Sequence, residues 1–339
     1  MPATSRPLET AARFAAAFGA RPATYAAILS AGISREQLRA AVGRGLILVV
    51  RRGHYALPPA TALDDDPRRF WPAHEVELRA ALADVGSGAF ATYDSAALAL
   101  QLARPSAEAP AVVTLARPGV QDFAGPGLIV RGSDIPAHQV VRVDGIPVTD
   151  LRRTSLDLAR GRSLPSALIP LDAGMRSWIA MRTGTSQNEL RKAVLDPQLR
   201  EEAHDEWRYV LHSLRGWPGV VAARRALSYA DPASESPLES RTRGWFLRAG
   251  LPFRIGAPVA TSSGHIYWAD FLDERSRTVG EADGWTKYGT DAVSVRTALA
   301  AERRRESYLR VDGWRIVRWT SSDPAAAVVD LWRRALRPD

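Results

Sequence analysis

Apolar positions in the N-terminal part of the chain follow a helical period three times and then a strand period twice. Helical spacing covers residues 8–18 and 24–31, and a third helix is expected to begin at Ser34, with Gln37 completing a capping box. Two short apolar runs then flank the tripeptide RRG, a pattern typical of a two-stranded hairpin. Three helices followed by a basic hairpin predict a winged helix-turn-helix domain over residues 1–62.

The pattern that follows mixes strands with helices and predicts a mixed α/β connecting domain. Asp144 and Gly145 lie between two alternating runs, as the turn of a hairpin. Thr149 or Asp150 then precedes the helical run LRRTSLDLAR as its N-cap. Further helical periods fall on residues 76–82, 166–181, 187–195 and 199–214.

The peptide ADPASESP, residues 230–237, is small, polar and flanked by proline, and it predicts a linker. Beyond it, helix, strand, turn, strand, helix and strand follow in order. Two strands joined through a crossover helix make a mixed sheet with a helix against it. The chain is therefore expected to be α+β and multidomain, with domains at residues 1–62, 63–230 and 237–339.

The composition limits the classes of protein. With 339 residues the chain is long enough for two or three domains. It contains no cysteine, which excludes disulfides, thiolate metal ligands and a cysteine nucleophile. No apolar run has the length of a bilayer span, and the N-terminus lacks the pattern of a signal sequence. A cytoplasmic protein with no membrane partner is expected.

The formal charge of +8 favours polyanionic partners, DNA above all. Arginine, which binds phosphate as a fork, is concentrated in residues 35–52 and 303–318. The third predicted helix would enter the major groove, and the tip of the hairpin would reach phosphate. The alternative is that these are ordinary solvated charges. The expected DNA-binding residues are Arg35, Gln37, Arg39, Arg44, Arg51, Arg52, Arg304, Arg305 and Arg318.

Acids interrupt two strand-like runs in the peptide YWADFLDERSRTVGEADG. Asp270 lies on the first predicted strand, and Glu281 and Asp283 lie two apart on one face of the second. If the turn between them pairs these strands, Asp270 and Glu281 come within reach of one ion, and Glu239 on the preceding helix adds a third carboxylate. Oxygen ligands of this kind suit Mg²⁺ or Mn²⁺, which would activate water for phosphodiester hydrolysis. Lys287 is the nearby cation expected to stabilise the transition state.

The alternative interpretation of these acids is a surface hairpin with solvated carboxylates. It accounts for Asp273 and Glu274, which flank the predicted turn. It accounts poorly for the other acids, because Trp268, Phe271 and Val279 beside them indicate a packed sheet, in which a charged carboxylate is costly. The sequence therefore favours an acidic, metal-binding site.

The tripeptide ADF, then EADG, then a helix ending in AERRRESYLRVDGWRIVRW resemble the PD-(D/E)XK nuclease fold in its very-short-patch-repair-like branch. The resemblance covers residues 237–325 and implies a restriction-endonuclease-like mixed sheet with flanking helices. It implies Asp270 and Glu281 as ligands of Mg²⁺ or Mn²⁺ and Glu239 as the helical glutamate of the site. Asp283 stands where many members of the wider superfamily carry the catalytic lysine, although the short-patch-like branch often has an acid there.

The peptide ATYAAILSAGISREQLRAAVGRG, the RRGHYALP hairpin and the run VTDLRRTSLDLAR resemble the AbiEi-type antitoxins. This resemblance covers residues 5–180. It implies a winged helix followed by a mixed domain, in a protein that represses its own operon and has a cognate toxin as its partner.

Two functions therefore remain. The first is a metal-dependent DNA endonuclease, with catalytic residues Glu239, Asp270, Glu281, Asp283 and Lys287. The second is an AbiEi-type antitoxin or transcriptional autorepressor whose nuclease-like domain is non-catalytic. A metabolic enzyme has little support, because the sequence contains no glycine-rich phosphate loop, nucleophile elbow or dinucleotide fingerprint. The sequence favours the first function and leaves open the DNA site, a toxin partner and a homodimer on paired half-sites.

Overall fold

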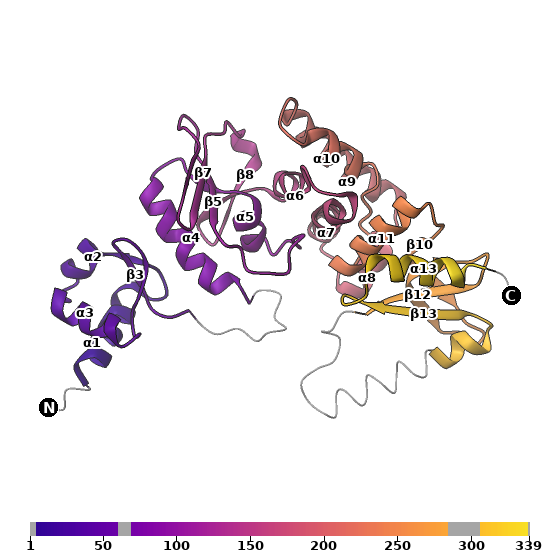
Figure 1. The fold of residues 1–339 in the computed structure, drawn as a ribbon, viewed down its shortest axis with the longest axis horizontal. Helices are drawn as coiled ribbons and strands as arrows, with labels where there is room; N and C mark the ends of the chain where they lie inside the picture. Colours follow the sequence, from indigo (N-terminus) through magenta and orange to yellow (C-terminus); the bar gives the residue numbers. More distant parts are fainter. Residues whose placement is uncertain (1–4, 60–68, 284–305, 338–339) are drawn as a thin grey trace. The chain divides into compact units, whose positions relative to one another are not determined.

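The computed structural model describes residues 5–59, 69–283 and 306–337 (Figure 1). The structure is α+β, and its described residues form helices and three sheets, of three, six and four strands. The three-stranded sheet is antiparallel, whereas the other two combine parallel and antiparallel pairs. No helix in these ranges is both long enough and apolar enough to cross a membrane.

Internal packing groups the chain into two compact units. The first unit comprises residues 1–102 and 106–154, and the second comprises residues 103–105 and 155–339. The three-stranded and six-stranded sheets belong to the first unit, and the four-stranded sheet belongs to the second. The helices that follow residue 155 are therefore part of the same compact unit as the acidic strands of the C-terminal segment.

The three helices and the hairpin predicted at the N-terminus are confirmed as elements. Gln37 N–H donates to Ser34 Oγ at 3.2 Å, and Ser34 N–H donates to Gln37 Oε1 at 2.8 Å, which is the predicted capping box. Phe14, Ile28 and Leu38 are buried in the core that the helices share. The elements are α1 Ser5–Phe18, β1 Ala23–Thr24, α2 Tyr25–Ser30, α3 Arg35–Gly43, β2 Leu48–Arg51 and β3 His54–Ala56, with sheet order β1-β3-β2.

The six-stranded sheet has the order β6-β7-β5-β4-β9-β8, and α4 and α5 pack against it. The hairpin turn predicted at Asp144 and Gly145 is confirmed, because both residues have positive φ, 48° and 78°, between antiparallel β8 and β9. The sequence did not predict β4 or β6, which are too short to show a period, or α5, which is buried from Ser95 to Ala99 and so lacks a contrasting polar face there. The elements are α4 Trp71–Val85, β4 Phe90–Ala91, α5 Tyr93–Ala99, β5 Val113–Ala116, β6 Phe123–Gly125, β7 Leu128–Arg131, β8 Val140–Val143 and β9 Ile146–Thr149.

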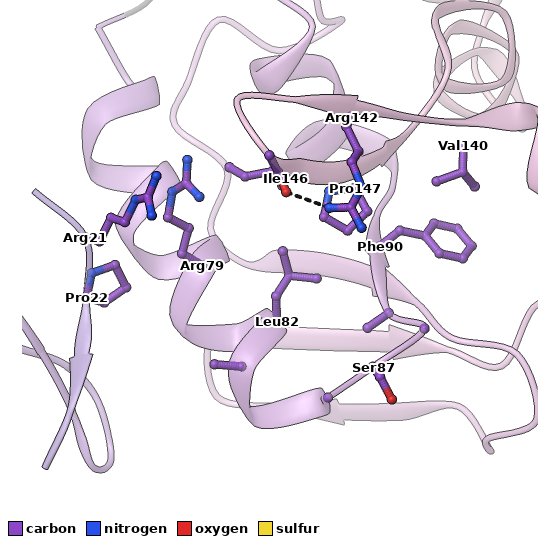
Figure 2. A pocket seen from close by; sticks show the side chains of 15 residues that line it. Arg21, Pro22, Arg79, Leu82, Ser87, Phe90, Val140, Arg142, Ile146 and Pro147 are labelled. Atoms are coloured by element: carbon purple, nitrogen blue, oxygen red, sulfur yellow. Dashed lines mark hydrogen bonds between the residues drawn. The ribbon is translucent and has the colours of Figure 1, made fainter. Parts of the chain in front are cut away.

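A cavity of about 740 Å³ lies in the first unit, with Arg79 of α4 and Arg142 of β8 in its lining (Figure 2). Arg79 Nη2 donates to the carbonyl oxygen of Asp144 at 3.0 Å, and Arg142 Nη1 donates to that of Gly145 at 2.8 Å. The β8–β9 turn therefore holds both guanidinium groups. No carboxylate or imidazole is among the residues described in the lining, so this cavity offers no acid or base for catalysis.

The helices from residue 151 onward were largely predicted. Asp150 Oδ1 accepts the N–H of Arg153 at 2.8 Å, which identifies Asp150 as the cap of α6. Trp207 Nε1 donates to Ser155 Oγ at 2.7 Å, and this buried indole joins α9 to α6. The sequence did not predict α10. The elements are α6 Leu151–Ala159, α7 Leu164–Thr183, α8 Gln187–Ala193, α9 Pro197–Ser213 and α10 Val220–Leu227.

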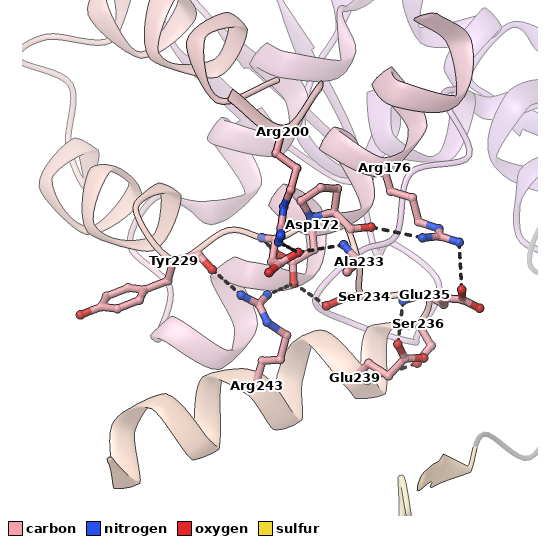
Figure 3. Close-up of polar contacts among 12 residues, drawn as sticks. Asp172, Arg176, Arg200, Tyr229, Ala233, Ser234, Glu235, Ser236, Glu239 and Arg243 are labelled. Carbon is pink, nitrogen blue, oxygen red and sulfur yellow. Dashed lines mark hydrogen bonds and ion pairs between the residues drawn. The ribbon is translucent and has the colours of Figure 1, made fainter. Parts of the chain in front are cut away.

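Residues 230–237, predicted as a linker, are instead packed into the second unit (Figure 3). Asp172 of α7 is fully buried and accepts the N–H of Asp231 at 2.8 Å and the hydroxyl of Ser234 at 3.1 Å. Arg243 Nη1 lies 2.5 Å from Asp172 Oδ2, and burial raises the pKa of Asp172. The linker prediction was wrong because small polar residues allow close backbone approach as readily as they allow exposure.

The four-stranded sheet has the order β10-β11-β12-β13, and only the β12–β13 pair is parallel. The strands β11, β12 and β13 and the helix α11 were predicted, whereas β10 and α13 were not. The helix predicted before β13 lies mostly outside the described residues, although residues 306–310 are helical. The elements are α11 Pro237–Ala249, β10 Arg254–Ala260, β11 Ile266–Asp273, β12 Thr278–Asp283, β13 Arg315–Thr320 and α13 Ala325–Ala335.

Aromatic rings fill the space between this sheet and the helices α11 and α13. The ring of Phe246 lies 5.3 Å from that of Phe271 and 5.4 Å from that of Trp332, measured between centroids. Gly280 of β12 allows the rings to approach, because a Cβ there would lie 2.6 Å from the Trp319 ring. Offset and edge-to-face packing of this kind fixes the sheet firmly against α11, the helix that carries Glu239.

Candidate functional site

Asp270 and Glu281 lie at the same end of the β11–β12 pair. The antiparallel register pairs Phe271 with Gly280, and Asp270 and Glu281 are the next residues outward on the two strands. The N–H of Ala282 donates to Asp270 Oδ2 at 2.9 Å, so the Asp270 side chain reaches across to β12. The prediction that these two acids lie on neighbouring strands is confirmed.

The other strand next to Asp270 is β10, which is interrupted at this point. The β10–β11 register omits one pair of residues, Gly256 and Asp270. Gly256 has a φ of +56°, and a Cβ there would lie 3.1 Å from the carbonyl oxygen of Ala233. A residue with a side chain would be strained and crowded here, so glycine lets β10 pass close to the 230–237 segment beside Asp270.

Glu239 is held at the first turn of α11 and is only 5% exposed. Glu239 Oε2 accepts the N–H of Glu235 at 2.7 Å, and Glu239 N–H donates to Ser236 Oγ, the N-cap, at 3.2 Å. Burial, followed by the negative charge of Asp270, raises the pKa of Glu239 to about 8. Glu239 and Asp270, 31 residues apart in the chain, therefore influence each other's charge in the fold.

Glu281 and Tyr267 form the next part of the site. Glu281 is 6% exposed, and its carboxylate forms a hydrogen bond with the hydroxyl of Tyr267. Burial raises the pKa of Tyr267 above its usual value, and the charges of Glu281 and Asp270 raise it further. Tyr267 therefore lies near both acids and is a neutral hydroxyl at any physiological pH. Tyr267 was not among the predicted site residues, because one tyrosine in a strand carries no motif.

Asp283 lies further along β12 and interacts with a cation. Arg318 Nη1 lies 3.3 Å from Asp283 Oδ2, and Arg318 Nη2 lies 3.8 Å from Glu306 Oε2. In the parallel β12–β13 pair, Arg318 is the partner of Glu281. Arg318, predicted to contact DNA, is thus already surrounded by carboxylates, and Asp283 forms an ion pair with an arginine.

The expected three-carboxylate metal site is not assembled. In the part of the chain that the structure describes, no three Asp, Glu or His side chains form a group able to hold a metal ion, so Glu239, Asp270 and Glu281 do not converge on one point. Mg²⁺ is usually held by one or two carboxylates and takes its remaining ligands from waters and substrate phosphates. Glu239 and Asp270 could supply two such carboxylates, because a backbone N–H holds each of them and the charge of Asp270 contributes to the raised pKa of Glu239.

Two arginines adjoin this carboxylate pair, and the sequence analysis missed both. Arg191 of α8 forms two hydrogen bonds with Glu235, of 2.7 Å and 2.8 Å, and Arg176 of α7 forms one of 3.1 Å (Figure 3 shows Arg176 and Glu235). The bond to Glu235 raises the pKa of Arg191, and the charges of Asp270 and Glu239 raise it further. These residues come from helices far upstream of the acidic strands, so no local motif could have connected them.

The N-terminal residues predicted to contact DNA differ in their exposure and in their contacts within the protein. Gln37 is occupied by the capping box, because its Oε1 accepts the N–H of Ser34. Arg51 Nε lies 3.2 Å from Asp84 Oδ2, so Arg51 has an acidic partner within the first unit. The exposed residues of this set are Arg35, Arg39, Arg44 and Arg52. An exposed arginine-rich helix and hairpin are thus present, although Arg51 and Gln37 already have partners.

Three of the predicted residues lie outside the described residues. These are Lys287, the expected transition-state cation, and Arg304 and Arg305, the expected DNA contacts on the helix before β13. Their assignments stay predictions. Within the described residues, the structure brings Glu239 near Asp270. Tyr267 lies near both Glu281 and Asp270. Asp283 forms an ion pair with Arg318.

No family model matches the sequence. Two curated proteins of Mycobacterium tuberculosis, from different strains, are each 29% identical to the chain over 201 residues. The match covers 59% of this chain and 64% of each relative, so the chain spans less than two thirds of their length. Both relatives are named only as uncharacterized proteins. They establish a sequence similarity and supply no activity.

Proposed function

We propose that the chain is a DNA-binding protein with a Mg²⁺- or Mn²⁺-dependent endonuclease site in its C-terminal sheet. The observation that carries the proposal is the burial of the Glu239 carboxylate, 5% exposed and held by the N–H of Glu235, where burial and the charge of Asp270 raise its pKa to about 8. Two carboxylates in such a place repel each other when both are ionised, and a bound divalent cation removes that repulsion. Acids with strongly shifted pKa values are typical of functional sites.

The proposed roles follow from the contacts of each side chain. Glu239 and Asp270 would hold the ion, and both are fixed by backbone N–H donors, from Glu235 and Ala282. When bound, the ion would act as a Lewis acid and lower the pKa of a water molecule for attack on phosphorus. The Tyr267 hydroxyl orients Glu281, and the guanidinium of Arg191, whose side chain is 40% exposed, is available to a phosphate oxygen beside the acids.

The arrangement of elements supports the domain types in this proposal. Three helices followed by a basic hairpin agree with a winged helix, and α11 before a mixed sheet ending in a parallel strand agrees with a PD-(D/E)XK nuclease domain. The exposed arginines of α3 and the β2–β3 hairpin would hold DNA phosphates. The proposal places the protein in the cytoplasm, where it would meet DNA.

A second candidate function is an AbiEi-type antitoxin or autorepressor whose nuclease-like domain is non-catalytic. The contact between Asp283 and Arg318 favours it, because an acid bound to an arginine stands where many nucleases of the wider superfamily carry a catalytic lysine. The missing three-carboxylate group, among the residues that the structure describes, favours it as well. In this case the protein would bind its operator with a cognate toxin as partner, as a monomer or as a homodimer on paired half-sites.

The decisive experiment is a nicking assay on supercoiled DNA in Mn²⁺, with a mobility-shift assay on the same samples. The variant Asp270→Asn keeps an oxygen that accepts the Ala282 N–H but removes the charge. Glu274→Gln is the matched control, because Glu274 is an acid of the same hairpin with a side chain 61% exposed. If the protein is an endonuclease, we expect metal-dependent nicking that is lost in Asp270→Asn and retained in Glu274→Gln.

The two candidate functions give opposite results in this assay. Binding of DNA without nicking, unchanged by EDTA and by Asp270→Asn, would remove the endonuclease and leave the repressor or antitoxin. Nicking that persists in Asp270→Asn would show a contaminating nuclease or a different site. Absence of both nicking and binding would contradict the two candidates together.

A further inference from the structure

A second basic cavity, of about 760 Å³, lies between α9 and α10 in the second unit. Its lining residues on α9 and just beyond fall at positions 201, 204, 208, 211, 212 and 215, and those on α10 at 224, 227 and 228. Intervals of three and four place each set on one face of its helix. Leu211 and Leu227 are buried at its base, so the cavity has an apolar floor and a polar rim.

The rim of this cavity is strongly basic. Three arginines and one glutamate contribute +3 and −1, which gives a charge of +2 when both histidines are neutral. Arg208 contacts Glu201 and Asp205, each at 2.7 Å, so its charge is balanced within α9. Arg215 and Arg224 are exposed and form no ion pair with any described residue. They are the excess positive charge of the cavity.

The polar groups around the two arginines can accept or donate hydrogen bonds. The side chain of Ser228 donates to the carbonyl oxygen of Arg225, and His212 Nδ1 lies 3.2 Å from the carbonyl oxygen of Arg208. Burial, followed by the charge of Arg208, lowers the pKa of His204, so this imidazole is neutral near pH 7. The cavity thus combines two uncommitted guanidinium forks with neutral polar groups and no uncompensated acid.

We propose that the cavity between α9 and α10 binds a phosphate group, with Arg215 and Arg224 as its two anion ligands. Guanidinium groups bind phosphate oxygens through paired, charge-assisted hydrogen bonds, and the two arginines that line this cavity offer two such groups. The phosphate comes either from a small phosphorylated molecule or from a nucleic-acid backbone. The inference goes beyond the proposed endonuclease, because none of its acids lines this cavity.

The test uses the full chain, the double variant Arg215→Ala with Arg224→Ala, and the control Arg225→Ala. Arg225 is exposed, lies next to Arg224 in the last turn of α10 and does not line the cavity. The control therefore removes a cation with the same helix-end environment. Thermal melting of all three proteins establishes that they are folded, as expected for exposed positions.

Two titrations separate the sources of the phosphate. Calorimetry with inorganic pyrophosphate tests a small ligand, and we expect the double variant to lose at least about tenfold in affinity while the control is unchanged. Fluorescence anisotropy with a DNA duplex over a range of salt concentrations tests the backbone, and loss of two phosphate contacts lowers the salt slope by roughly 2. A loss of pyrophosphate affinity or of salt slope that the double variant shows and Arg225→Ala does not supports the site. The titration in which the loss occurs identifies the source of the phosphate.

The proposal is overturned if the double variant and the native protein give the same result in both titrations. It is overturned equally if Arg225→Ala causes half the loss of the double variant or more, since the effect would then follow net charge and not the cavity. These outcomes do not depend on Mn²⁺, on nicking or on Asp270, so they stand apart from the fate of the endonuclease proposal.

Discussion

Two neighbouring regions of the C-terminal sheet differ in what they bury: one buries aromatic rings and the other buries carboxylates. Around Gly280, the rings of Phe246, Phe271, Trp319 and Trp332 pack at centroid distances of 5.3 to 6.4 Å, and the glycine lets them meet. One residue away on each strand, Asp270 and Glu281 bring carboxylates into the protein, and the buried Glu239 adds a third nearby. The first region is closely packed, whereas in the second region burial and the charge of Asp270 raise the pKa of Glu239.

The difference indicates how such a conflict is maintained. An isolated pair of carboxylates would move apart or become solvated. Here the aromatic region fixes α11 and the strands, and the backbone N–H groups of Glu235 and Ala282 fix the two carboxylates. The packed region therefore supplies stability, and the acidic region uses part of that stability to hold two carboxylates in place, as the proposed cation site requires.

The largest effect on stability is expected from Asp172→Ala. Asp172 is fully buried, pairs with Arg243 and holds residues 231 and 234, which lead into the Glu239 turn. Removing it leaves a buried arginine without its carboxylate, which costs about 3–5 kcal/mol. Urea unfolding measures the loss. The exposed acid Asp205 of α9 gives the control Asp205→Ala, with a loss below about 1 kcal/mol; equal losses would contradict the buried network.

A smaller loss is expected from Gly280→Ala. The added Cβ would lie 2.6 Å from Trp319 and 2.9 Å from Trp332, so the rings must shift, at a cost of about 1–3 kcal/mol. Gly43→Ala is the matched control, because nothing lies within 4 Å of a Cβ there and its φ is not positive. A Gly280→Ala protein as stable as the control in the same urea titration would show that packing does not fix this region.

Glu239→Gln should alter how stability depends on pH. An unfolded glutamate ionises near pH 4.5, whereas folded Glu239 ionises near pH 8. Between these values the folded state binds the additional proton, so the stability of the native protein falls as pH rises through this window and is level above it. Glu239→Gln removes that titration, so its Tm relative to the native protein should rise between about pH 5 and about pH 9. A parallel pair of Tm profiles would mean that Glu239 is not buried beside Asp270.

Arg191→Ala should have the smallest effect on stability. Its bond with Glu235 is partly exposed, and such ion pairs contribute less than about 1 kcal/mol. If the Arg191 guanidinium also contacts the scissile phosphate, the nicking rate of Arg191→Ala should fall by about tenfold or more. Its affinity for DNA, which the N-terminal segment is proposed to supply, should stay the same. Arg333→Ala, which removes an exposed arginine paired with Asp330 on α13, is the control for loss of a cation. Unchanged nicking in Arg191→Ala would show that Arg191 does not contact the scissile phosphate.

Local patterns predicted local structure well and long-range contacts poorly. The capping box of Ser34, the Asp144–Gly145 turn and the strands that carry Asp270 and Glu281 all follow from a few neighbouring residues. Very short strands such as β4 and β6, of two and three residues, have no room to show a period. The neighbours of Glu239 were beyond prediction from the sequence, because Arg176 and Arg191 approach it through tertiary packing alone.

The central claim is that Glu239 and Asp270 together hold a divalent cation. Its most direct test is a titration of Mn²⁺ into the protein, followed by electron paramagnetic resonance of the free ion, for the native chain, Asp270→Asn and Glu274→Gln. We expect the native chain and Glu274→Gln to bind Mn²⁺ more tightly as pH rises toward the pKa of Glu239, about 8, and Asp270→Asn to lose this binding. Equal Mn²⁺ binding by all three proteins, or none by the native chain at pH 8 and above, would contradict the account.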